Sequence, residues 1–184
     1  AVTAAIQELA PDALILPIRV FRDGLRASAR ALAGAIRCAI EARVDLVNLS
    51  LGTTNPAHEH VFAVLAEEAA AAGALIVAAR EAEGVPCWPG CLTAVLGVGL
   101  DWDVPRGTPG LGADGVVLAS GYPRPIPGVL QQRNLYGISF AVAQVTGWVA
   151  ANCVERPIRR ETVLAGLAPI GVHPTDKVQP RLEA

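Results

Sequence analysis

Methionine is absent from this 184-residue sequence, and aromatic residues make up only 4% of it. Because Ala1 is therefore not an ordinary translation start, we expect the chain to be a processed product or a part of a longer polypeptide. Charged residues amount to 17%, the net charge is −2, and no basic tract indicates a nucleic-acid surface. Glycine and proline interrupt the apolar runs before they reach the length of a membrane span. The sequence thus predicts neither a nucleic-acid partner nor a membrane span.

Cysteine is also scarce, with four residues in the chain. Cys38 and Cys153 lie in apolar helical stretches, where we expect them to pack as small hydrophobic side chains. Cys87 and Cys91 flank a Trp-Pro-Gly turn, and they either close a small loop by oxidation or remain free thiols. No histidine or second cysteine pair lies near them, and no acidic run is typical of a calcium loop. We therefore predict no metal site and no cofactor.

Alanine, valine, leucine, isoleucine and glycine are abundant, and 52% of the residues are hydrophobic. This composition suits a parallel sheet covered by helices on both faces. Hydrophobic periodicity and the positions of glycine and proline predict helices over 1–9, 28–43, 56–72, 139–153 and 159–167, and strands over 13–21, 45–51, 74–79, 93–100 and 116–120. The alternation implies parallel strands with right-handed crossovers in a single α/β domain over 1–184, with a loosely ordered tail from Pro169.

A formal G-x-G-x-x-G motif occupies residues 110–115. Phosphate binding by this motif requires a preceding strand and a following helix. Here the motif precedes a predicted strand instead, so we assign no nucleotide site to it.

Ser139 follows Gly137-Ile138 at the point where a turn runs into the long apolar helix. Two interpretations of Ser139 follow from the same physics. In one, Ser139 is an N-cap whose hydroxyl accepts a backbone N–H of the first turn. In the other, it is a nucleophile placed where the positive end of the helix dipole favours a developing oxyanion. The local sequence alone favours the cap.

Five segments, in order, resemble the subtilisin-like serine peptidases. They include A-P-D-A at 10–13, V-N-L-S-L-G at 47–52 and G-I-S-F-A at 137–141, together with the predicted strands at 76–79 and 93–99. The resemblance covers nearly the whole chain. It implies a subtilisin-like, doubly wound, mostly parallel α/β fold whose N-terminal part is missing from this chain.

The resemblance also implies roles for individual residues. Ser139 takes the place of the nucleophile. The main chain of Ser50, Leu51 and Gly52 would pair with an extended peptide or protein substrate, a mode that needs only backbone groups. Residues 78–82, with Ala78 and Ala79 first, would line the first specificity pocket. Without the resemblance, both segments are simply strand ends.

Three departures from the family pattern are visible. The aspartate and the His-Gly-Thr histidine of the family's triad precede the A-P-x-A turn, and the helix at residues 1–9 resembles the one that follows this histidine. Both partners are therefore expected outside this chain, in an N-terminal segment of the same protein, because His58, His60 and His173 do not fit the position. Ala82 stands where the family has an oxyanion asparagine, and Arg80 is either a substitute donor or paired with neighbouring glutamates. Milder changes replace a threonine by Ile138 and a proline by Ala143.

The resemblance implies a serine endopeptidase that hydrolyses peptide bonds through an acyl-enzyme at Ser139. The alternative is a pseudoprotease that binds peptides or proteins without cleaving them, because the oxyanion asparagine is absent. An unrelated α/β domain in which Ser139 only caps a helix is a third possibility. In each case we expect this chain alone to be inactive as a protease, since a serine without a base is a weak nucleophile.

Overall fold

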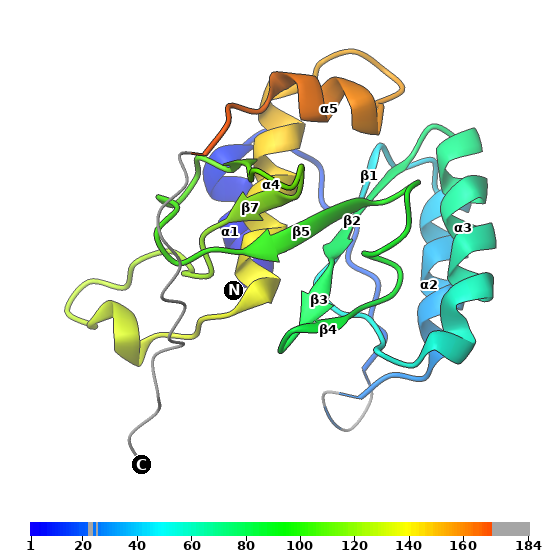
Figure 1. Cartoon of the computed structure of the whole chain (residues 1–184), viewed down its shortest axis with the longest axis horizontal. Coiled ribbons are helices and arrows are strands. Elements are labelled where there is room, and N and C mark those ends of the chain that lie inside the picture. The colour runs from blue at the N-terminus through cyan, green and yellow to red at the C-terminus, as the bar shows by residue number, and fades with distance from the viewer. Residues whose placement is uncertain (22–23, 25, 171–184) are drawn as a thin grey trace.

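The computed structural model describes residues 1–21, 24 and 26–170, and its centre is a five-stranded sheet (Figure 1). The strands lie in the spatial order β1 (Leu46–Leu49), β2 (Leu75–Ala79), β5 (Leu96–Leu100), β7 (Val117–Ala119) and β6 (Gly110–Leu111). The first four are parallel to one another, and β6 is antiparallel to β7. The predicted mostly parallel α/β architecture is therefore confirmed.

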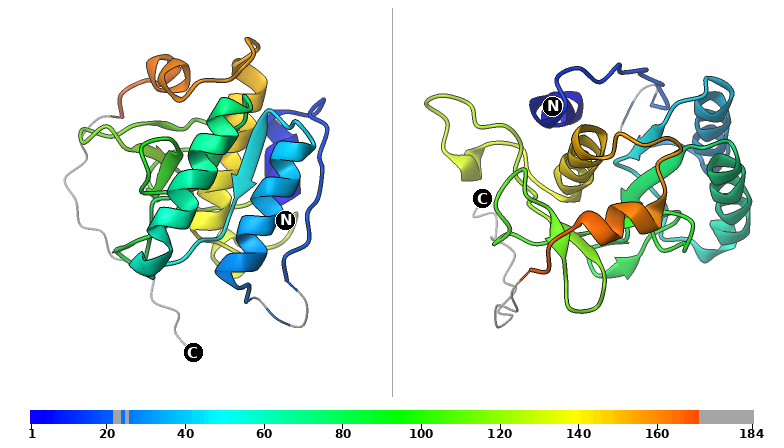
Figure 2. Two further views of the ribbon diagram at one scale, coloured as in Figure 1. Left: turned by 90° about the vertical axis from the view of Figure 1, so that its right-hand side faces the viewer. Right: turned by 90° about the horizontal axis from the view of Figure 1, so that it is seen from above.

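Helices cover both faces of the sheet, as Figure 2 shows from two directions. One layer consists of α2 (Ala29–Glu41) and α3 (Glu59–Ala71), and the other of α4 (Ile138–Asn152) and α5 (Arg160–Gly166). The first helix, α1 (Val2–Leu9), packs on α4. Two 3-10 turns, Pro56–His58 and Gln131–Arg133, lie in the connections.

Strand β2 lies between two hydrophobic cores. Leu75, Val77 and Ala79 pack with α4 and α5, whereas Ile76 and Ala78 pack with α2 and α3. Side chains of a strand alternate between the faces, so a strand covered on both faces must be apolar at every position. This explains the uninterrupted apolar run that predicted the strand.

Helices α1 and α4 run in the same direction and touch closely. A Cβ atom on Gly147 would lie 2.8 Å from the carbonyl oxygen of Ile6, so only glycine permits this approach. Nearer the start of α4, Phe140 packs in a buried cluster with Ala5 and Ile6, and Val2 packs against that cluster. Both helices therefore begin at the same end of the molecule, as the N label in Figure 1 indicates.

The predicted strand over 13–21 is wrong. These residues belong to no strand, and Leu14, Ile15 and Leu16 are exposed. A strand requires a hydrogen-bonded neighbour, and among the described residues nothing pairs with this segment. Strand β1 lies at the edge of the sheet, and its outer side likewise has no strand partner in the described part of the chain.

Three other predictions also need correction. β5 begins at Leu96 rather than at residue 93, because the preceding residues form a turn closed by the Val95 N–H donating to Leu92 O (3.1 Å). Cys38 is exposed on the face of α2 that points away from the core. Ile170 is ordered, since its N–H donates to Leu111 O (2.8 Å), while residues 171–184 of the predicted loose tail lie outside the described residues.

Two short pairings were not predicted. β3 (Glu81–Ala82) and β4 (Val85–Pro86) form an antiparallel hairpin, whose turn residues Glu83 and Gly84 both have positive φ angles. β6 and β7 form the other, and the G-x-G-x-x-G segment comprises β6 and the turn that leads to β7, so it lies before a strand rather than before a helix. In the described residues, no helix has the length and hydropathy needed to cross a membrane.

Candidate active site

The start of α4 is anchored through Gly137. This residue occupies the N-cap position with φ of 134°, a conformation that favours glycine, and its N–H donates to Gly121 O (2.9 Å). Ser139 is the second residue of the helix and does not cap it. The N-cap interpretation of Ser139 is therefore wrong, and its hydroxyl is directed elsewhere.

Ser139 and Ser50 exchange two hydrogen bonds. The Ser139 hydroxyl donates to the Ser50 carbonyl oxygen (3.2 Å), and the Ser50 hydroxyl donates to the Ser139 carbonyl oxygen (3.0 Å). Ser50 directly follows β1, so the pair joins the carboxyl end of a parallel strand to the start of α4. In open α/β sheets this is the edge where ligands bind.

The Ser50 hydroxyl is itself held by a side chain of β1. Asn48 Nδ2 donates to Ser50 Oγ (3.0 Å), and the buried hydroxyl of Thr146 lies 2.9 Å from Asn48 Oδ1. Thr146, Asn48, Ser50 and Ser139 thus form a connected polar row between α4 and β1. Sequence reasoning did not identify Asn48 or Thr146 as site residues. The available signal was an asparagine inside an otherwise apolar strand, where a buried amide needs partners.

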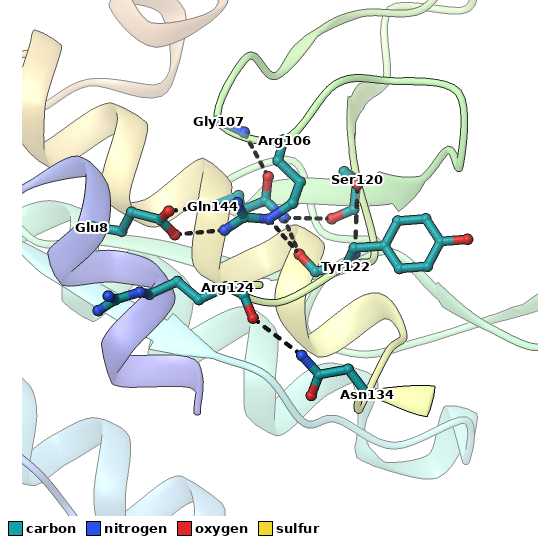
Figure 3. Close-up of polar contacts among 8 residues, drawn as sticks. All are labelled: Glu8, Arg106, Gly107, Ser120, Tyr122, Arg124, Asn134 and Gln144. Carbon is teal, nitrogen blue, oxygen red and sulfur yellow. Dashed lines mark hydrogen bonds and ion pairs between the residues drawn. The ribbon is translucent and has the colours of Figure 1, made fainter. Parts of the chain in front are cut away.

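A second polar network surrounds Gln144 of α4, whose side chain is buried (Figure 3). Its amide oxygen accepts from Gly107 N (2.7 Å), and its amide nitrogen donates to Ser120 O (2.9 Å) and Tyr122 O (2.8 Å). These bonds hold both neighbours of Gly121, the residue whose carbonyl anchors Gly137. Gln144 therefore stabilises the position of the joint that carries Ser139.

Arg106 extends this network to α1. Its guanidinium forms an ion pair with Glu8 of α1 and donates from Nε to Tyr122 O (3.2 Å), as Figure 3 shows. A bidentate arginine–carboxylate contact fixes orientation as well as distance. The network therefore links α1, α4 and the loop between them on the side of the molecule where α4 packs against α1.

The residue at the family's oxyanion position offers no side-chain donor. Ala82 lies in the β3–β4 hairpin, and its methyl group cannot donate a hydrogen bond. Arg80 is exposed and forms no ion pair with any described carboxylate, so its predicted pairing with Glu81 or Glu83 is wrong.

Among the other residues predicted to line the site, Gly52, Ala78 and Ala79 direct no side chain toward a substrate. Gly52 lies so close to the loop after β4 that a Cβ atom would be 2.6 Å from Cys87 Sγ. Thr53 and Trp88 pair just beyond it, with N–H to O distances of 2.9 and 2.8 Å. Ala78 and Ala79 are buried in the two cores, so their side chains face the protein interior.

Cys87 and Cys91 are free thiols in this structure. The Cys91 Sγ donates to Arg80 O (2.8 Å), and Cys87 is buried. Burial, and secondarily the nearby Cys91, raise the pKa of the Cys87 thiol above its ordinary value. The Cys87 thiol is therefore not an activated thiolate.

Neither histidine of the described residues forms a hydrogen bond with Ser139. His58 and His60 lie at the start of α3, the hydroxyl of Ser139 donates to Ser50 instead, and His173 lies outside the described residues. Within residues 1–21, 24 and 26–170, no group of three His, Cys, Asp or Glu side chains is arranged to hold a metal ion. The described chain thus presents a positioned serine without a base.

Comparison with known proteins agrees with the observed fold. A model of the subtilase family, Peptidase_S8, matches residues 2–83. The structure of the prenylagaramide maturation protease PagA is similar with 25% identity and a TM-score of 0.55, over 72% of this chain and 52% of that one. A lanthipeptide protease shares the fold with 15% identity and a TM-score of 0.63, over 89% of this chain and 64% of that one.

This chain thus spans between about half and two-thirds of the length of these two structures. No curated protein matches its sequence significantly. The family match to residues 2–83 and the likeness to two proteases, which extends beyond that segment, together support the assignment of this chain to the subtilisin-like S8 peptidase family.

Proposed function

We propose that this chain carries the nucleophile of a subtilisin-like serine endopeptidase, with Ser139 as the attacking residue. The histidine and aspartate would come from polypeptide that precedes Ala1. The observation that carries this proposal is the parallel packing of α1 and α4: Val2 packs against the cluster that contains Phe140, the neighbour of Ser139. A histidine just before Ala1 would therefore lie at the end of the molecule where Ser139 is positioned.

A second observation supports an additional N-terminal part. The outer side of β1 lacks a strand partner in the described residues, and the extended segment over 13–21 exposes Leu14 and Leu16. Exposed apolar side chains and an unpaired strand edge are both unfavourable, and further polypeptide that includes a strand would cover them. An aspartate-bearing strand from the same protein fits this requirement.

In the proposed reaction, the histidine removes the proton that Ser139 Oγ now donates to Ser50 O. The oxygen attacks the peptide carbonyl, the amine leaves with a proton from the histidine, and water hydrolyses the acyl-enzyme. The first-turn N–H of Ser139 has no intrahelical partner, and it would donate to the oxyanion. The substrate would lie extended along Ser50, Leu51 and Gly52.

The experiment uses the longer protein with a fluorophosphonate probe, which reacts with activated serines. Labelling at Ser139 and its loss in Ser139→Ala are expected. Ser28→Ala is a suitable control, because Ser28 caps α2 and accepts from Ala31 N (3.1 Å), so its loss affects stability and not the site. Labelling that persists in Ser139→Ala would refute the assignment. The present chain alone should show no Ser139-dependent peptide cleavage.

The absence of an oxyanion amide predicts a slow enzyme, since one such donor contributes about 10²–10³ in turnover. Ala82→Asn should therefore raise kcat by roughly tenfold or more. Ala82→Leu, which adds similar bulk without an amide, is the matched control. An equal effect of the two substitutions on kcat in a peptide-cleavage assay would contradict this explanation.

The same alanine favours a second candidate function, a pseudoprotease that binds an extended peptide. This candidate predicts no fluorophosphonate labelling of the longer protein and unchanged peptide affinity in Ser139→Ala. Fluorescence anisotropy with a labelled peptide library would measure that affinity. Labelling and cleavage together would exclude this alternative.

A further inference from the structure

A small cavity lies away from Ser139, among the loop before β5, the start of β7 and the helix α5. Its volume is about 70 Å³, whereas one water molecule needs only ~10–15 Å³. Both Arg80 and Arg160 line it, and Thr93 and Cys91 are its other polar side chains. No acidic side chain lines it.

The position of the Arg160 guanidinium is defined by the loop. Its Nε donates to Val95 O (3.2 Å), a residue that also lines the cavity. The two Nη groups carry four further donors in a planar fork, the geometry that matches a carboxylate or phosphate group. Arg160 thus lines the cavity with its Nε held in place, and its fork has the chemistry to bind such a group.

Arg80 is fixed at its backbone, where its N–H donates to Val98 O (2.9 Å) and its carbonyl accepts from Cys87 N (2.9 Å). In the described chain, Arg80 and Arg160 form no ion pair, although Arg37, Arg106 and Arg156 each pair with a carboxylate. Two positively charged side chains that line one cavity repel each other, and an anion bound there would replace that repulsion with attraction.

Two glycines build the wall beside these arginines. A Cβ atom on Gly90 would lie 1.9 Å from Ala79 O, and one on Gly97 would lie 2.3 Å from Gly90 O. Neither position has room for a side chain, so only glycine fits at both. The close backbone packing holds the loop against β2 and β5, which gives the cavity a fixed shape.

We propose that this cavity binds a small oxyanion, a phosphate or carboxylate group, between Arg80 and Arg160. Arg80 is the one residue that the cavity shares with the segment predicted to border the Ser139 site, and the proposal does not rest on the proposed function. The size of the cavity suits such a group alone or the end of a small metabolite. Binding would stabilise the folded chain, because a ligand that binds only the native state raises the unfolding temperature.

The test titrates the chain with sodium phosphate, sodium acetate or sodium chloride at constant ionic strength and follows thermal unfolding. A saturable stabilisation by phosphate or acetate, but not by chloride, is expected, and the tighter of the two identifies the preferred group. Arg80→Gln and Arg160→Gln should each weaken the apparent affinity at least tenfold. Arg159→Gln, an exposed neighbour that does not line the cavity, should leave it unchanged.

A second readout guards against variants that are simply less stable. In ¹H–¹⁵N NMR spectra, phosphate or acetate should shift the backbone amides of Gly90, Gly97 and Gly115, which line the cavity. The amide of Gly34 on α2 should not move. A stabilisation that rises linearly without saturation, or that is equal in Arg80→Gln, Arg160→Gln and Arg159→Gln, would overturn the proposal.

Discussion

The side-chain amide of Gln144 forms hydrogen bonds with three backbone groups from two loops. Its replacement by leucine would leave Gly107 N, Ser120 O and Tyr122 O without their present partner. Buried groups without partners cost about 1–3 kcal/mol each when water does not replace the bond, so we expect a loss of about 2–4 kcal/mol in the free energy of unfolding. Urea denaturation measures this, with Gln7→Leu on the exposed face of α1 as the control. Equal effects of the two substitutions would contradict the role of Gln144.

The four thiols should differ sharply in reactivity. Cys38 is exposed, whereas burial raises the pKa of the Cys87 thiol and, against the opposing effect of Arg156, that of Cys153. Only the thiolate reacts, so at pH 7–8 a raised pKa means a smaller reactive fraction. Iodoacetamide followed by mass spectrometry should modify Cys38 first. Modification of Cys87 at the same rate would contradict the burial seen here.

The role of a residue in the site could be inferred from the sequence only where a local pattern marked that residue. Ser139 was identifiable because a glycine turn and a long apolar helix surround it. Its hydroxyl partner was not, because Ser50 lies 89 positions away and the contact exists only after the sheet and helix have packed. Gln144 was missed for a related reason. Within an apolar helix, a glutamine is visible in the sequence, but the three backbone groups that satisfy it come from distant loops.

At the scale of elements, the contact between α1 and α4 depends on Gly147. Gly147→Ala would place a methyl group against the Ile6 backbone, and we expect a loss of about 1–3 kcal/mol as the helices separate. Gly34→Ala in α2 is the matched control, because nothing lies within 4 Å of its Cβ position. That change should stabilise by up to about 1 kcal/mol through helix propensity. Thermal unfolding should show a lower unfolding temperature for Gly147→Ala and a higher one for Gly34→Ala.

Helices and buried strands could be predicted because their periodicity is local. The errors occurred where structure depends on a neighbour. Residues 13–21 have the composition of a strand, yet they lack a partner to pair with in the described chain. In contrast, β6 has only two residues and too little sequence to be recognised, and it exists because β7 and Ile170 lie beside it. Pairing, and not propensity, decided both cases.

At the scale of the whole molecule, the exposed stretch Leu14-Ile15-Leu16 should cause self-association of this chain when it is isolated. Replacement of Leu14 and Leu16 by aspartate should reduce association without lowering the free energy of unfolding. Light scattering over a concentration series and urea denaturation measure the two quantities. Val154→Asp, at another exposed apolar residue, is the control. A loss of stability on replacing Leu14 and Leu16 would show that the segment packs internally.

The two edges of the central sheet are unlike. At β6, Leu111 N donates to Ala168 O (2.8 Å) and Ile170 N donates to Leu111 O (2.8 Å), so a C-terminal segment covers that edge, while β1 is open in the described chain. A sheet with one open edge can be extended by a second copy only through that edge, by pairing of the two β1 strands. Such an assembly closes at two subunits and has no site for a third, whereas two open edges would allow an endless fibre. Association of this chain through the β1 edge should therefore stop at the dimer.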